Sequence, residues 1–210
     1  MESQSQAKGI PQPESGIEHV AHWVSRVGSP PLLALLSSFL VTLHQESPRR
    51  WLWLGLYVGL AMFLPMLFLL WQLKQGRVTD VDIYYRRQRR ESLLVTIVGA
   101  VLSWIALRWA GAPPSMLLLA GIGFVQGIII LLVTLGWKIS IHATAAASMA
   151  AFLLAEFQST AWPAVLLVPL IAWSRIKLRR HSVAQVMVGI VAGVSSFLLT
   201  WVLTTFLAVR

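Results

Sequence analysis

The chain has 210 residues, of which 57% are hydrophobic and only 12% are charged. That composition leaves too little polar side chain to cover a soluble domain, and it also excludes a disordered chain, collagen and a coiled coil. The net charge of +9 comes from basic residues beside apolar stretches, where lipid head groups and membrane topology explain it, so we expect no nucleic-acid partner.

The N-terminal segment, residues 1–15, is polar, contains two prolines and has no apolar core. We expect it to be a flexible leader, followed by a single integral membrane domain over residues 16–210. Over residues 16–28 apolar residues recur at helical spacing, which predicts a short helix lying in the membrane interface. Its two histidines have no third ligand nearby in sequence, so we interpret them as solvated surface residues.

Seven apolar stretches follow, each at or near the length that crosses a bilayer. They extend over residues 30–44, 51–73, 93–109, 114–137, 139–157, 161–173 and 182–209. The first is short for a full crossing unless the preceding helix continues into it. Tryptophans fall near most ends of these stretches, as in the aromatic belts of membrane proteins. The predicted fold is therefore all-α, a polytopic transmembrane helical bundle of six to seven spans.

Threading the spans alternately through the membrane gathers most basic residues on one side, which we call side A. Side A holds 13 of the 17 Lys and Arg: Lys8, Arg26, Lys74, Arg77, Arg86, Arg87, Arg89, Arg90, Lys138, Arg175, Lys177, Arg179 and Arg180; the other four are Arg49, Arg50, Arg108 and Arg210. The positive-inside bias assigns side A to the cytoplasm. We expect a multi-pass protein of the plasma membrane of a prokaryote.

Ionisable groups inside or at the edge of a span are energetically costly and mark candidate functional sites. His142 lies one turn into the fifth span and His181 opens the last one. An even number of crossings between them returns both to side A, where Arg175 also lies. Two imidazoles with guanidinium groups can handle a phosphate: one ring attacks, the other donates a proton, and arginines hold the oxygens. Since the chain has no cysteine and no acidic metal cluster, we expect no metal and no other cofactor.

Ser174 and Arg175, followed after five residues by His181, resemble the third signature of the type 2 phosphatidic acid phosphatase family, the membrane relatives of vanadium haloperoxidases. Gln185, four residues further on and followed by two glycines, resembles the dolichyl-diphosphatase-like variant, in which Gln replaces the more usual Asp. The resemblance implies a haloperoxidase-like helical core over about residues 51–207.

The other two signatures of this family match less well. The second, Pro-Ser-Gly-His, is matched only by Ser140 and His142 in the segment Ile139–His142. The first, a Lys followed seven residues later by Arg-Pro, has no full match in the loop over residues 74–91. Arg86, Arg87, Arg89 and Arg90 stand in that loop and are candidates for its role.

The resemblance also implies roles for individual residues. His181 would be the nucleophile that forms a phosphohistidine, and His142 the general acid that protonates the leaving group. Arg175 would bind phosphoryl oxygens. The further phosphate-binding candidates are Arg86, Arg87, Arg89, Arg90, Lys138, Ser140 and Ser174. Gln185 or Asp82 would orient the nucleophile, unless Asp82 and its neighbour Asp80 simply pair with adjacent arginines.

These residues favour an integral membrane hydrolase that removes phosphate from a lipid phosphate or a polyprenyl diphosphate without a metal ion. Of the two substrates the polyprenyl diphosphate is slightly favoured, and this preference rests on Gln185 alone. Its partners would be this substrate and membrane lipids, and the sequence predicts no oligomeric state. One alternative is a catalytically silent relative that binds phospholipid head groups or acts as a membrane scaffold. A transporter is a further alternative, which the absence of an internal sequence repeat disfavours.

Overall fold

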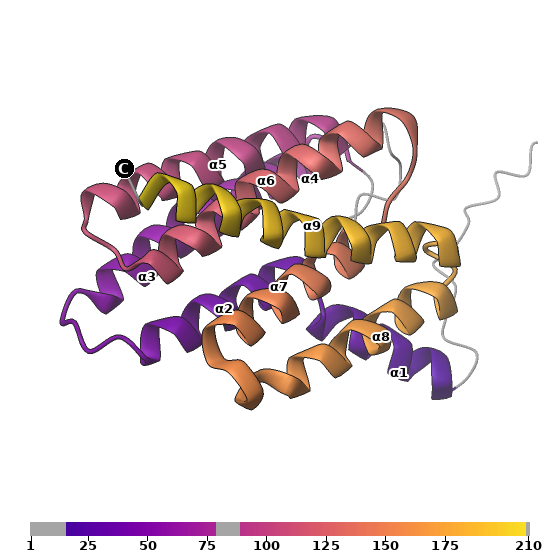
Figure 1. Cartoon of the computed structure of the whole chain (residues 1–210). Helices are drawn as coiled ribbons and strands as arrows, with labels where there is room; N and C mark the ends of the chain where they lie inside the picture. The colour runs from indigo at the N-terminus through magenta and orange to yellow at the C-terminus, as the bar shows by residue number, and fades with distance from the viewer. Residues whose placement is uncertain (1–15, 79–88, 209–210) are drawn as a thin grey trace, which may run out of the picture.

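The computed structural model describes residues 16–78 and 89–208, and every regular element in these ranges is helical (Figure 1). The elements are α1 (Gly16–Val27), α2 (Pro30–Leu43), α3 (Arg50–Tyr57), η1 (Val58–Phe63), α4 (Leu64–Lys74), α5 (Arg89–Trp109), α6 (Pro114–Gly136), α7 (Ile141–Phe157), η3 (Gln158–Ala161), α8 (Trp162–Lys177) and α9 (Val183–Ala208). The predicted leader, Asp80, Asp82, Arg86 and Arg87 lie outside the described residues, and only the backbone of Arg89 lies within them. The all-α membrane bundle is thus confirmed.

Within the described ranges, five helical stretches are long and apolar enough to cross a membrane, and a sixth is formed if α1 and α2 make one span. The prediction of six to seven spans counted α7 and α8 as two. They belong to one continuous apolar stretch, Ile141–Lys177, in which α8 folds back against α7. With 17 and 16 residues, each is about 25 Å long, shorter than a hydrocarbon core of roughly 30 Å. The chain is an integral membrane protein.

The predicted interfacial helix forms α1, which is bent by 51° from α2. Two prolines open α2, and a residue before proline is pushed toward extended backbone, as Ser29 shows with φ −70° and ψ 145°. The preceding Gly28 allows α1 to approach α8, because a Cβ there would lie 2.6 Å from the side chain of Ile171. The break between α1 and α2 therefore lets α1 pack against α8, which carries Ser174 and Arg175 of the third signature.

Helices α7 and α9 pack backbone to backbone at the centre of the bundle, and they run side by side in Figure 1. A Cβ on Gly189 would lie 2.8 Å from the carbonyl oxygen of Ser140. A Cβ on Gly193 would overlap the carbonyl oxygen of Thr144. The two glycines of the third signature thus permit a close helix contact, as small residues do in membrane helix pairs. This contact sets the position of α9 relative to the start of α7.

The basic residues gather at one end of the bundle, as the sequence predicts. At the right of Figure 1 lie α1 and the α6–α7 and α8–α9 connections, and at the left lie the end of α9 and the α2–α3 and α5–α6 connections. The right-hand end carries Arg26, Lys138, Lys177, Arg179 and Arg180, and the left-hand end carries Arg49, Arg50 and Arg108. The first end corresponds to side A.

Candidate active site

The α6–α7 and α8–α9 connections meet at side A and bring the two candidate histidines together. The backbone N–H of Ser140 donates to the carbonyl of Gln185 over 3.2 Å, and Lys138 Nζ donates to the carbonyl of Arg180 over 3.1 Å. His142, in the first turn of α7, and His181, just before α9, line the same cavity. Each is only 7% exposed. The structure therefore places both imidazoles at one end of the bundle, around one space.

The turn after α8 accounts for the spacing between Arg175 and His181. The carbonyl of Arg175 accepts hydrogen bonds from the N–H groups of Arg180, over 3.1 Å, and of His181, over 3.3 Å. Arg179 adopts the left-handed conformation, φ +52°, that commonly closes the C-terminus of a helix. The chain thus returns over the last turn of α8. Five intervening residues are therefore enough to bring His181 back to Arg175.

A capping box at the start of α9 orients the His181 ring. The N–H of Gln185 donates to Ser182 Oγ over 3.3 Å, and the N–H of Ser182 donates to Gln185 Oε1 over the same distance. Because a backbone N–H can only donate, the atom it meets is the carboxamide oxygen of Gln185. His181 Nδ1 lies 3.1 Å from that same oxygen, so in the neutral ring Nδ1 carries the hydrogen and Nε2 the lone pair.

Among the residues that the structure describes, Arg175 supplies the positive charge in the lining of this cavity. Its side chain lines the same cavity as the two histidines and is only 3% exposed. One of its terminal nitrogens donates to the hydroxyl of Ser25 in α1. Helix α1 therefore packs against α8 beside the site and holds the guanidinium group. No sequence pattern around Ser25 indicated this contact, and we did not predict it.

Three predicted phosphate-binding residues instead hold the frame of the site and do not line the cavity. Ser140 is the N-cap of α7, and its hydroxyl accepts from the N–H of Ala143 over 3.4 Å. The hydroxyl of the fully buried Ser174 donates to the carbonyl of Ile171 over 2.7 Å. The ammonium group of Lys138 donates to a carbonyl of the α8–α9 turn. Arg90, at the start of α5, is exposed.

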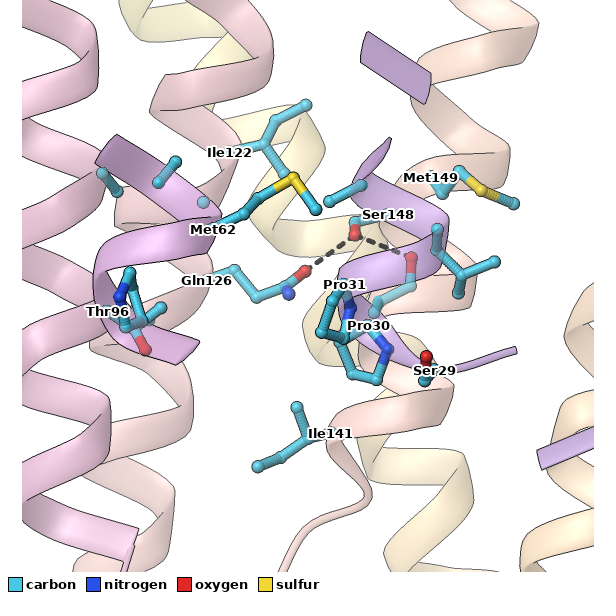
Figure 2. Close-up of a pocket in the computed structure, with 18 of the residues that line it drawn as sticks. Ser29, Pro30, Pro31, Met62, Thr96, Ile122, Gln126, Ile141, Ser148 and Met149 are labelled. Carbon is cyan, nitrogen blue, oxygen red and sulfur yellow. Dashed lines mark hydrogen bonds between the residues drawn. The ribbon is translucent and has the colours of Figure 1, made fainter. Parts of the chain in front are cut away.

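Away from the histidines the cavity, about 510 Å³ in volume, continues between α2, η1, α4, α5, α6 and α7. Its wall there is mostly apolar, and Figure 2 shows Met62, Ile122 and Met149 facing it from three different elements. A few polar side chains interrupt this wall, among them Gln126 and Ser148, which we did not single out from the sequence. Across residues 16–78 and 89–208 no three His, Cys, Asp or Glu side chains group as metal ligands. A polar end with an apolar extension suits an amphiphile with an anionic head.

Residues 135–207 match the family model of the PAP2 superfamily. Over this segment, about a third of the chain, the sequence is similar to the PAP2 superfamily. The matched segment includes His142, Arg175 and His181, together with the α7–α9 contact that sets their spacing. It supports the haloperoxidase-like helical core, and the members of this superfamily are phosphatases. No curated protein and no solved structure matches the chain.

Proposed function

We propose that this chain is a member of the PAP2 superfamily and a membrane lipid phosphatase that releases phosphate from a lipid phosphate or a polyprenyl diphosphate through a phosphohistidine, without a metal ion. The observation that supports this most strongly is the convergence of His142, Arg175 and His181 on one cavity whose remaining wall is mostly apolar. The family match and the membrane-spanning helices agree with a phosphoric ester hydrolase acting on a lipid.

In the proposed first step, Nε2 of His181 attacks the phosphorus atom. A P–N bond forms, the bond from phosphorus to the lipid oxygen breaks, and His142 gives its proton to that oxygen. The guanidinium group of Arg175 and the N–H groups in the first turn of α7 stabilise the negative charge on the phosphoryl oxygens. In the second step a water molecule gives a proton to His142 and attacks phosphorus; a P–O bond forms, the P–N bond breaks with the neutral His181 imidazole as leaving group, and inorganic phosphate is released.

Gln185 acts on the nucleophile and does not touch the substrate. Its carboxamide oxygen fixes the hydrogen of His181 on Nδ1, which presents the lone pair of Nε2. A neutral amide stabilises the imidazolium less than the carboxylate that is usual in this family. The proposed nucleophile is therefore correctly oriented but slower than one backed by Asp.

We place the site on the cytoplasmic side of a prokaryotic plasma membrane, because the basic connections lie at the same end of the bundle as the histidines. The chain has no cysteine, so a single cysteine introduced at the exposed Gln75, beside Gly76 and just after α4, reports the exposure of this end. A membrane-impermeant thiol reagent added to intact cells should leave it unlabelled, and labelling from outside would reverse the orientation.

The proposal is tested by phosphate release from a panel of lipid phosphates and diphosphates in detergent, with a chelator present. His181→Ala should abolish release. His142→Ala should lower it more for lipid alcohols than for an aryl phosphate, whose leaving group needs no proton. His19→Ala, an exposed histidine of α1, is the matched control and should retain full activity.

One observation favours the alternative of a silent relative that binds phospholipid head groups. Lys138, Ser140 and Ser174, which we predicted to be phosphate-binding candidates, do not line the cavity. If the wild type and His181→Ala are equally inert on the whole panel, yet bind vesicles containing anionic lipid, this second function replaces the first.

A further inference from the structure

The apolar part of the cavity contains a hydrogen-bonding group that the proposed chemistry does not use. Gln126 lies in the middle of α6, and its Oε1 accepts from the hydroxyl of Ser148 in α7 over 2.7 Å. Figure 2 shows the carboxamide of Gln126 reaching across the cavity toward Ser148. Because Oε1 faces this donor, Nε2 points its two hydrogens elsewhere, and among the described residues none offers it an acceptor.

A carboxamide donor without an acceptor at this depth costs free energy, since the membrane interior holds little water to replace it. Gln126 is partly exposed, so its amide faces the cavity and is not enclosed by protein. The single hydrogen of the Ser148 hydroxyl is directed at Gln126 Oε1 over the shorter distance, 2.7 Å, and is shared with the carbonyl of Ala145 over 3.1 Å. The structure thus presents a fixed donor to whatever molecule fills this space.

The distance from the histidines to this donor can be estimated along α7. Ser148 follows His142 by six residues, which corresponds to an axial rise of about 9 Å. Both side chains line the cavity, together with Ala145 and Phe152, so the cavity extends along α7 from one to the other. A ligand whose phosphorus lies beside His142 therefore meets the Gln126 amide about 9 Å further into the membrane.

Diacylglycerol phosphates carry an acceptor at about that distance. Six bonds separate phosphorus from the nearer ester carbonyl oxygen and seven separate it from the other, and an extended chain advances roughly 1.2 Å per bond, giving about 7 to 8 Å. A polyprenyl diphosphate attacked at its outer phosphorus has its last oxygen only three bonds away, about 4 Å, and presents hydrocarbon beyond it. Only the first class satisfies the Gln126 amide.

We infer that Gln126 is a specificity determinant, whose Nε2 donates a hydrogen bond to an ester carbonyl of a diacylglycerol phosphate bound with its phosphate at His142 and His181. The inference rests on the proposed function and narrows its substrate class. Ser148 fixes the orientation of the amide, and Met62, Ile122 and Met149 contact the adjoining acyl chain. The Gln126 hydrogen bond favours the diacyl lipid as substrate, whereas the resemblance at Gln185 slightly favours the polyprenyl diphosphate.

The test compares a diester lipid, dioleoylglycerol phosphate, with its diether analogue, which has the same phosphate and chain length but no carbonyl. For the wild type in mixed micelles, kcat/KM should be about tenfold higher for the ester than for the ether, the effect of one buried hydrogen bond. In Gln126→Leu and in the better-matched Gln126→Met this ratio should fall to near one. Thr134→Val, which removes a buried polar group from the same helix outside the cavity, is the control and should keep the wild-type ratio.

The outcomes separate this inference from the function on which it rests. An active wild type with an ester-to-ether ratio near one, or with a higher kcat/KM for a polyprenyl diphosphate than for the diester, overturns the role of Gln126 and leaves the phosphatase intact. A ratio that survives in both Gln126 variants does the same. A wild type that releases no phosphate from any lipid overturns the proposed function, and the inference with it.

Discussion

The contact between α7 and α9 at Gly193 makes a sharp prediction about how the site is held. In Gly193→Ala the new Cβ would overlap the carbonyl oxygen of Thr144 and lie 2.9 Å from Ala147 Cβ and 3.0 Å from the backbone nitrogen of Ser148. None of these atoms can rotate away, so α9 must move from α7 by roughly 1 Å. Overpacking of this kind costs about 1 to 3 kcal/mol. A Gly to Ala change inside a helix returns about 1 kcal/mol, which leaves a net loss of about 0 to 2 kcal/mol.

The effect on activity should be larger than the effect on stability. The start of α9 carries Gln185, which bonds through its carbonyl to Ser140 and through its side chain to His181. Moving α9 away from α7 therefore moves the proposed nucleophile away from His142. A misplacement of about 1 Å lowers catalytic rates by about a hundredfold. We expect kcat/KM for lipid phosphate to fall by one to two orders of magnitude in Gly193→Ala.

The assay measures phosphate release and thermal unfolding in the same detergent. Gly55→Ala is the control, because no atom lies within 4 Å of a Cβ at that position in α3, and it should retain activity and equal or exceed wild-type stability. A Gly193→Ala protein with wild-type kcat/KM would refute the idea that this helix contact sets the spacing of the two histidines.

Three further substitutions test other parts of the structure. Gln185→Leu should lower kcat at least tenfold by removing the acceptor for His181 Nδ1 and should destabilise the start of α9 by about 1 kcal/mol, whereas Gln185→Glu, which keeps both hydrogen bonds, should restore kcat. Arg179→Gly should retain wild-type stability because glycine adopts positive φ freely, and Arg179→Val should lose stability; thermal unfolding measures both. Gln72→Leu should lower the unfolding temperature, because it removes the 2.7 Å bonds that join α4 to Glu91 and Ser92 and costs about 1 to 3 kcal/mol; an unchanged temperature would contradict this.

The parts of the structure that could be predicted are those that local sequence determines. Apolar stretches of sufficient length predicted the helices, and alternate threading predicted that His142 and His181 share one end of the bundle. The number of spans was harder to predict, because α7 and α8 are each shorter than a bilayer and are joined by one turn of 3-10 helix. Length alone cannot separate a tight hairpin from one long helix.

The parts that could not be predicted depend on which faces of distant helices meet. Ser25 lies in α1, whose sequence is typical of an amphipathic interfacial helix. The bend between α1 and α2 brings Ser25 to Arg175. Ser140 and Ser174 match the family signatures, yet their hydroxyls bond to nearby backbone. Gln126 is an isolated polar residue within an apolar span, and that position alone indicates a functional role. We did not predict one from the sequence.

Trapping of the covalent intermediate tests the central claim most directly. The purified protein is mixed with a lipid phosphate, quenched in base because phosphohistidine is labile in acid, digested, and analysed by mass spectrometry. The account predicts a phosphoryl group on the peptide that contains His181, and none on any peptide of His181→Ala. Turnover without a phosphorylated histidine, or with the phosphoryl group on another residue, would contradict it.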